Sequence, residues 1–255
     1  MSTPAIIPES TRMRGVSLMF AAAAIYLALH LAGLHKLFDR DEQGIGALLQ
    51  IVGTLYSVVY AFATYVIWGQ FAAVENEILK ESGALKDLIL FSRGLKEASR
   101  DAMVRAVRAY ARAVWESEWG VLSRGGDLER TDKLFASIIA SVTEAKPADE
   151  FERQTYDQVL EIANQASGHR DERLALSAKR IPRTLLLFVT LTAFTILFLL
   201  LLYPFHNLAM GLIAIAVASM LLWFAHFVLT DLDNPFEGTW NVSAQAFADL
   251  ATKYR

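Results

Sequence analysis

Residues 45–71 read IGALLQIVGTLYSVVYAFATYVIWGQF, an apolar stretch with no charged side chain that continues into charged sequence after Phe71. A helix needs about 20 apolar residues to cross a bilayer, so this stretch is long enough for a membrane span. Small or polar side chains recur along it every three or four residues, which places them on one helical face. They are Gln50, Thr54, Ser57, Ala61, Thr64 and Trp68. The stretch therefore predicts a membrane helix with one polar stripe.

The polar stripe has two possible uses in a membrane helix. Small and hydroxyl-bearing residues let helix backbones approach closely in lipid, so the stripe can be a packing seam. Alternatively, the stripe faces water and lines a pore that is shared between subunits. The residues alone leave both interpretations open.

The composition supports an integral membrane protein and excludes several other classes. The 255 residues are 54% hydrophobic, above the roughly 45–50% of a soluble domain. Further spans are predicted at 16–34, 184–203 and 208–230. The net charge of −3 argues against nucleic acid as a partner, and the absence of cysteine excludes disulfides and thiol catalysis. No phosphate-binding loop, dinucleotide fingerprint, nucleophile elbow or metalloprotease signature occurs, so no enzyme is expected.

The charged sequence between the second and third spans predicts a helical domain, because its apolar residues recur at helical and not at strand spacing. The expected fold is all-α, with four transmembrane helices and a cytoplasmic helical domain inserted between the second and the third. Its parts are an N-terminal tail with spans one and two (1–71), the helical domain (72–182), spans three and four (183–230) and a C-terminal tail (231–255). The second helix is expected to continue past Phe71. Breaks between helices are expected at 123–127, 146–149 and 167–169.

The orientation in the membrane follows from the basic residues. Four spans place both termini and the helical domain on one side, which carries Arg12, Arg14, Arg173, Lys179, Arg180 and Arg183 near the membrane. The other side has only Lys36 and Arg40, which are outnumbered by acidic residues. The excess of positive charge predicts that the helical domain and both termini are cytoplasmic.

The sequence DLDNPFEG at 231–238 is a candidate ion site. Asp231, Asp233 and Glu237 offer carboxylate oxygens, the hard ligands that calcium prefers. The alternative is a turn that ends the fourth span and starts a last helix, with Ser243 as its N-cap. Both interpretations stay open.

Three other polar residues are weighed as candidates. His226 is an ionisable residue inside the fourth span, which makes it a functional candidate, although a neutral histidine bonded to a neighbouring helix is the commoner outcome. Glu116 and Glu118 resemble a carboxylate pair. Two residues apart on a helix they point to different sides, so they are not expected to act together.

The organisation of spans and several motifs resemble the bestrophin-like membrane proteins of bacteria. The motifs are Trp68-Gly69-Gln70-Phe71 running into Glu75 and Glu77, the segment from Tyr110 through Trp115-Glu116-Ser117-Glu118-Trp119, and Leu232-Asp233-Asn234-Pro235-Phe236-Glu237-Gly238. The resemblance covers nearly the whole chain. It implies a homo-oligomer, a pentamer by analogy, in the inner membrane of a bacterium.

The resemblance also implies roles for residues. Bestrophin channels line a narrow neck with their second span, and the corresponding positions at one-turn spacing are Gln50, Thr54 and Val58. The bestrophin neck is apolar, whereas this one is mostly polar. In bestrophins a comparable Asn-Pro-Phe turn leads into an acidic calcium clasp, here reduced to Asp231, Asp233 and Glu237.

The function expected from this resemblance is an oligomeric ion channel that conducts inorganic anions such as chloride, with the second span lining the pore. Hydroxyl groups, amide hydrogens and the edges of aromatic rings can stabilise a partly dehydrated anion. No basic residue occurs in the second span, so weak selectivity is expected. The alternative is a non-conducting membrane scaffold or sensor whose cytoplasmic helices bind a protein partner.

Overall fold

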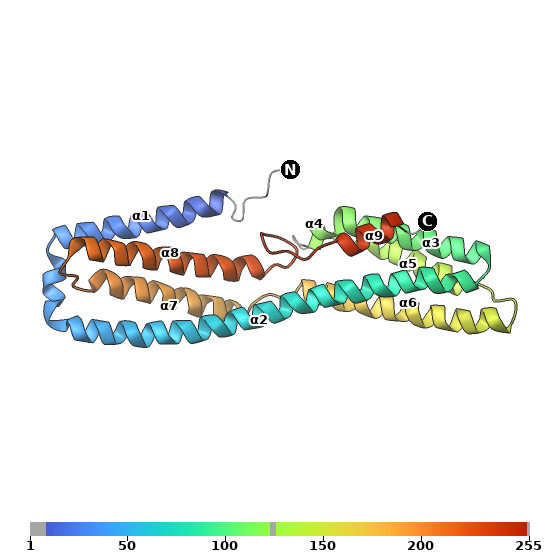
Figure 1. Ribbon diagram of the computed structural model, residues 1–255, viewed down its shortest axis with the longest axis horizontal. Coiled ribbons are helices and arrows are strands. Elements are labelled where there is room, and N and C mark those ends of the chain that lie inside the picture. The colour runs from blue at the N-terminus through green and yellow to red at the C-terminus, as the bar shows by residue number, and fades with distance from the viewer. Residues whose placement is uncertain (1–8, 123–125, 254–255) are drawn as a thin grey trace. The chain divides into compact units, whose positions relative to one another are not determined.

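The computed structural model describes residues 9–122 and 126–253, and all regular structure in these ranges is helical (Figure 1). The α-helices are α1 (Glu9–Leu31), α2 (Glu42–Phe91), α3 (Glu97–Ala113), α4 (Trp119–Leu122), α5 (Glu129–Thr143), α6 (Glu150–Ser177), α7 (Arg183–Leu202), α8 (Leu208–Leu232) and α9 (Gln245–Lys253). Two 3₁₀ helices, η1 (Leu34–Asp41) and η2 (Ser92–Gly94), and a π-helical turn, η3 (Val114–Glu118), complete the described chain. The all-α prediction is confirmed.

Four helices are long and apolar enough to cross a membrane, as the sequence predicts. They fall at Met13–Leu31, within Lys36–Gly94, at Arg183–Leu202 and at Leu208–Leu232. Local signals set their ends. Pro182 precedes α7, and the Asn207 side chain caps α8 by accepting hydrogen bonds from the N–H groups of Ala209 and Met210.

The chain forms two compact units, each built from two separate segments. The first unit contains Met1–Trp68 and Arg180–Asp233, and the second contains Gly69–Lys179 and Asn234–Arg255. Helix α2 therefore contributes its first half to one unit and its second half to the other. The predicted division at 71, 182 and 230 concerns the sides of a membrane and stays a prediction.

The first unit is held by α1 and α8, which lie side by side, with α7 packed against α8 (Figure 1). Ala22, Tyr26 and Ile215 form its buried centre. A Cβ atom on Gly211 would lie 1.9 Å from the Tyr26 hydroxyl oxygen, so only glycine fits there. Tyr203 donates a hydrogen bond of 2.9 Å to Glu42 at the start of α2.

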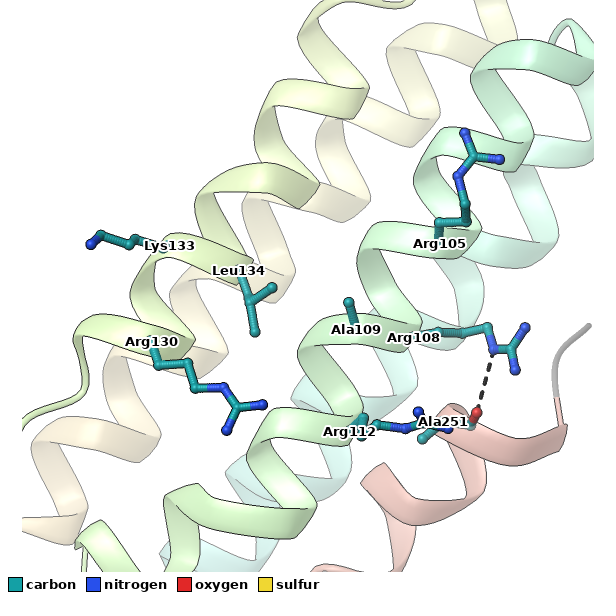
Figure 2. A pocket seen from close by; sticks show the side chains of 8 residues that line it. All are labelled: Arg105, Arg108, Ala109, Arg112, Arg130, Lys133, Leu134 and Ala251. Carbon is teal, nitrogen blue, oxygen red and sulfur yellow. Dashed lines mark hydrogen bonds between the residues drawn. The ribbon is translucent and has the colours of Figure 1, made fainter.

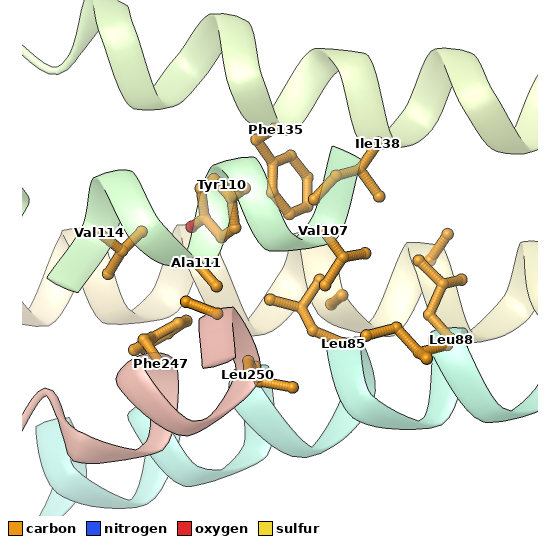
Figure 3. Packing of buried hydrophobic residues seen from close by; sticks show 14 of the residues in the cluster. Leu85, Leu88, Val107, Tyr110, Ala111, Val114, Phe135, Ile138, Phe247 and Leu250 are labelled. Carbon is orange, nitrogen blue, oxygen red and sulfur yellow. The ribbon is translucent and has the colours of Figure 1, made fainter. Parts of the chain in front are cut away.

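The second unit has a larger core, formed by α3, α5, α6, α9 and the second half of α2 (Figure 3). Leu85, Val107, Tyr110 and Ile138 are at most 1% exposed. Phe247 of α9 is fully buried and stacks edge-on against Tyr110 at a centroid distance of 6.4 Å. The C-terminal helix is therefore part of this core.

One predicted break is wrong, because α6 runs unbroken through 167–169. Gly168 is exposed on this helix, where a glycine costs only about 1 kcal/mol relative to alanine. Burial of Ala163, Ala166 and Arg170 on the opposite face holds the helix together. The break at 146–149 is confirmed by Asp149, which caps α6 at the Glu152 N–H. Residues 123–125 of the third predicted break lie outside the described residues.

Candidate functional site

The predicted stripe on α2 lies on the exposed face of that helix within the first unit. Gln50, Thr54, Ser57, Val58, Ala61 and Trp68 are exposed, and Thr64 is partly buried. Between Glu42 and Trp68 only Ile45, Ala63 and Ile67 are buried. The first half of α2 is therefore mostly uncovered within its own chain.

The exposed face of α2 has two edges with different chemistry. Gln50, Thr54, Ser57, Ala61 and Trp68 form what we call the polar edge. Next to it, Leu48, Ile51, Leu55, Val58 and Phe62 form the apolar edge, and each of them is at least 45% exposed. Val58 sits where the two edges meet, because it is one turn beyond Thr54. A shallow groove of about 500 Å³ runs along this boundary and is lined by Gln50, Ile51, Thr54, Leu55 and Val58.

The hydroxyl groups of the stripe already donate to their own helix. Thr54 Oγ1 donates to the Gln50 carbonyl oxygen at 2.8 Å, Ser57 Oγ to that of Gly53 at 2.8 Å, and Thr64 Oγ1 to that of Tyr60 at 2.9 Å. These hydroxyls therefore present oxygen lone pairs outward, and a hydroxyl must rotate before its hydrogen can contact an anion. The side-chain amide of Gln50 keeps its own N–H donors.

The candidate calcium residues do not form a cluster of ligands. Among residues 9–122 and 126–253, no group of three histidine or acidic side chains is placed to hold a metal ion. Asp233 Oδ1 accepts a hydrogen bond of 2.6 Å from the Ile181 N–H, and Glu237 Oε2 accepts one of 3.3 Å from the Asn234 amide. Asn234 Oδ1 accepts from the Phe236 N–H, as in a turn, and Ser243 Oγ accepts from the Gln245 N–H at the start of α9. The calcium site at Asp231, Asp233 and Glu237 stays a prediction.

His226 lines a small pocket inside the first unit. The pocket has a volume of about 150 Å³, and Thr190, Ser219 and Trp223 are among its lining residues. The His226 ring makes no hydrogen bond to any side chain that the structure describes, so the expected bond to a neighbouring helix is not observed.

A buried ionic network in the second unit joins Glu118, which the sequence presents only as half of a carboxylate pair, to Arg173, which the sequence predicts near the membrane. Arg173 of α6 is fully buried and donates from Nε to Glu81 Oε2 at 2.6 Å and from Nη1 to Glu118 Oε1 at 2.5 Å. The Tyr110 hydroxyl donates to Glu81 Oε1 at 2.5 Å. Both carboxylates are buried as well, and Glu118 Oε2 has no hydrogen-bond partner among the described residues. One guanidinium thus joins α2, α3, α6 and η3.

The surroundings of Arg173 keep it charged. Burial lowers the pKa of an arginine, but Glu81, Tyr110 and Glu118 outweigh this effect and raise the pKa of Arg173 above its usual value. The guanidinium also lies 5.7 Å from the Trp119 ring and 5.6 Å from the Phe247 ring, within the range of cation–π attraction. Burial, followed by the charge of Glu81, raises the pKa of Tyr110 well above its usual value, so its hydroxyl stays a donor.

Two local features position this network. The π-helical turn η3 contains both Glu116, which is exposed, and Glu118, which is buried, so the two do not act as a pair. On α6, Arg170 and Arg173 occupy the same helical register as the buried Val159, Ala163 and Ala166. Charged residues in a buried register are the sequence signal that could have revealed the network.

Comparisons with known proteins agree with this fold. The family profile described as Bestrophin-like domain matches residues 15–247. A bacterial bestrophin homologue from Klebsiella pneumoniae carrying a point mutation matches with a TM-score of 0.74 and 13% identity, covering 94% of this chain and 98% of that chain. Another structure of a bestrophin homologue from the same organism gives a TM-score of 0.67 at 12% identity, covering 92% and 98%. Identities this low show a shared fold. No curated protein sequence matches.

Proposed function

The chain belongs to the Bestrophin-like domain family, and on this premise we propose that it forms an oligomeric ion channel in a bacterial inner membrane. In this proposal α2 lines the pore, and the second unit and both termini are cytoplasmic. The homo-oligomer is a pentamer by analogy with bestrophins.

The observation that carries the proposal is the exposure of the polar edge of α2. Tyr26 and Ile215, on the spans that pack together, are at most 1% exposed, whereas Gln50, Thr54 and Ser57 lie on the open face of α2. A side-chain amide facing lipid cannot satisfy its hydrogen bonds, which costs free energy. Water in a pore satisfies them.

The two edges of α2 fit a ring of subunits. With the polar edge facing a central axis, the apolar edge from Leu48 to Phe62 turns toward the neighbouring subunit, which covers it. A ring of identical subunits therefore gives the polar edge water in the pore and covers the apolar edge with protein. A monomer leaves the polar edge in lipid and encloses no pore.

The chemistry of the polar edge supports weakly selective anion conduction. It contains no acidic side chain to repel anions, and the Gln50 amide offers N–H donors. Thr54 and Ser57 contribute donors only after their hydroxyls rotate away from the backbone, so they stabilise an anion weakly. Selectivity is therefore a property of the Gln50 position more than of the hydroxyls.

A bulky residue on the polar edge tests the proposal. Thr54→Trp should reduce ion flux into liposomes at least tenfold, because the indole fills the pore, while the mass of the detergent-purified oligomer stays unchanged. Leu191→Trp, at an exposed position of α7 outside both edges of α2, is the matched control and should leave flux within about twofold. Thr54→Lys should shift the reversal potential toward that of the anion, since a charge in a constriction acts at an effective dielectric of about 20.

The alternatives give different results. If the stripe is a packing seam, Thr54→Trp dissociates the oligomer or lowers its melting temperature without a specific effect on flux. If a stable oligomer of the native chain carries no ion at all, the channel proposal is rejected and the scaffold or sensor remains.

A further inference from the structure

A strongly basic groove lies on the surface of the second unit, between α3 and α5 (Figure 2). Its volume is about 590 Å³, within the roughly 300–1,000 Å³ of small-molecule sites. Among the residues that the structure describes, five cationic side chains line it and no acidic one does: Arg105, Arg108 and Arg112 on α3, and Arg130 and Lys133 on α5. The whole chain carries a net charge of −3, so this concentration of positive charge is local.

The positive charges of the groove are poorly compensated. Arg105 and Arg130 make no ion pair with any residue that the structure describes. Among the described residues, the ion-pair partner of Arg112 is Glu116, whose Oε1 lies 3.9 Å from the arginine Nε. Lys133 Nζ lies 2.5 Å from Glu129 Oε1. Arg105, Arg108 and Arg112 follow one another at three and four residues on one helical face, where like charges destabilise a helix. A bound anion removes this repulsion.

The groove also orients its arginines. Arg108 Nε donates to the carbonyl oxygen of Ala251 on α9 at 3.3 Å, which holds the guanidinium at one end of the groove. Arg130 extends from α5 toward α3, whereas Lys133 points away from it (Figure 2). On α3, Arg108 and Arg112 extend toward Ala251 of α9 and not toward α5, so the guanidinium groups that line the groove are distributed over both sides of α3 (Figure 2). The planar donors of arginine match phosphate oxygens in pairs, which a lysine cannot do.

We propose that this groove binds a small soluble anion that carries at least two linked phosphate groups, such as a diphosphate or triphosphate compound. Two linked phosphates are needed because the Arg130 guanidinium and those of Arg108 and Arg112 lie on different sides of α3. Ala109, Leu134 and Ala251 are the apolar lining, and none of the lining residues within 9–122 and 126–253 is aromatic, so none of them offers a base a ring to stack on. Recognition therefore acts on the phosphates and not on an attached base, and single-stranded nucleic acid, which uses aromatic stacking, is a poor fit.

The test is titration of the full chain in detergent by calorimetry, with sodium tripolyphosphate and pyrophosphate as probes. We expect saturable 1:1 binding that weakens as salt rises from 50 to 300 mM, and at least tenfold weaker binding of inorganic phosphate. Arg130→Gln should reduce tripolyphosphate affinity about tenfold, and Arg130→Lys should restore it only in part. Arg153→Gln, which removes an exposed arginine of α6 outside the groove, is the control and should change affinity less than twofold.

Each contrary result overturns the proposal. Equal losses in Arg130→Gln and Arg153→Gln mean general attraction to a charged surface. Binding of short-chain phosphatidic acid but not of tripolyphosphate means a lipid headgroup site, and tight binding of an oligonucleotide alone means a nucleic-acid surface. Circular dichroism and melting of each variant without ligand confirm that it is folded. These measurements involve no ion flux, so a failure of the channel proposal leaves them unaffected.

Discussion

The two halves of α2 are one continuous helix in very different surroundings. From Glu42 to Trp68 the helix is mostly exposed and carries a polar and an apolar edge. From Gly69 to Phe91 it is buried every three or four residues, and Glu81 lies fully inside the second unit. The side chains of the second half pack against other helices of the same chain. Those of the first half are left to contact water, lipid or other copies of the chain.

The two halves show which polar side chains indicate function in this fold and which stabilise it. Glu81 is buried, but both of its carboxylate oxygens accept hydrogen bonds from Arg173 or Tyr110, so its role is to stabilise the second unit. The side chains of Thr54 and Gln50 are exposed and have no hydrogen-bond partner on another of the described helices, so they indicate a role outside the single chain. Three substitutions test this distinction between buried and exposed polar groups.

The largest effect is expected from Arg173→Met, which removes the charge that both Glu81 and Glu118 face. Leaving buried carboxylates unpaired costs about 3–5 kcal/mol, so the free energy of unfolding of the second unit should fall by that amount. Denaturant titration followed by tryptophan fluorescence measures it, because Trp119 lies beside the guanidinium. The exposed Arg153→Met is the matched control. Equal stability of the two variants would show that the network is not required.

A smaller effect is expected in the first unit from Gly211→Ala. The new Cβ would lie 1.9 Å from the Tyr26 hydroxyl oxygen, and relief of such overpacking costs about 1–3 kcal/mol. The melting temperature in detergent should fall. Gly53→Ala meets no atom within 4 Å and should not lower it. A harmless Gly211→Ala would mean that α1 and α8 pack less closely than described.

The smallest effect is expected from Tyr110→Phe, which removes one donor to Glu81 and should cost about 1 kcal/mol at pH 7. The native chain should show a further dependence on pH. Because the pKa of Tyr110 is raised in the folded chain, the unfolded chain loses this proton first, near pH 10, and stability falls as the pH rises above 10. Tyr110→Phe should flatten this fall. Denaturant titrations of both chains from pH 7 to 11 measure it, and identical slopes would contradict the buried donor.

The helical fold could be predicted from the sequence because the hydropathy of a segment and the spacing of its apolar side chains are local properties. The four helices that are apolar enough to cross a membrane and the continuation of α2 past Phe71 follow from runs of side chains that can be counted. The break at 167–169 failed because Ser167 and Gly168 signal a turn, whereas burial of Ala166 and Arg170 from other helices holds α6 together. Such tertiary contacts have no local signature.

The sites were predictable only in part. The polar stripe was visible as a repeat, but the division of the exposed face into two edges depends on which side of α2 its neighbours cover. The ionic network joins Glu81, Glu118 and Arg173 across helices that are distant in sequence. Glu118 enters the network in the π-helical turn η3, which spacing rules for a regular helix do not describe.

The position of α9 has a consequence for biosynthesis. Phe247 and Leu250 complete the core of the second unit, but residues 180–233, which include α7 and α8, are translated before them. At roughly 5–20 residues per second, the ribosome needs on the order of several seconds to deliver α9 after Lys179. During that interval the nascent second unit exposes the surface that α9 later covers. The order of translation therefore makes synthesis of α7 and α8 precede completion of this core.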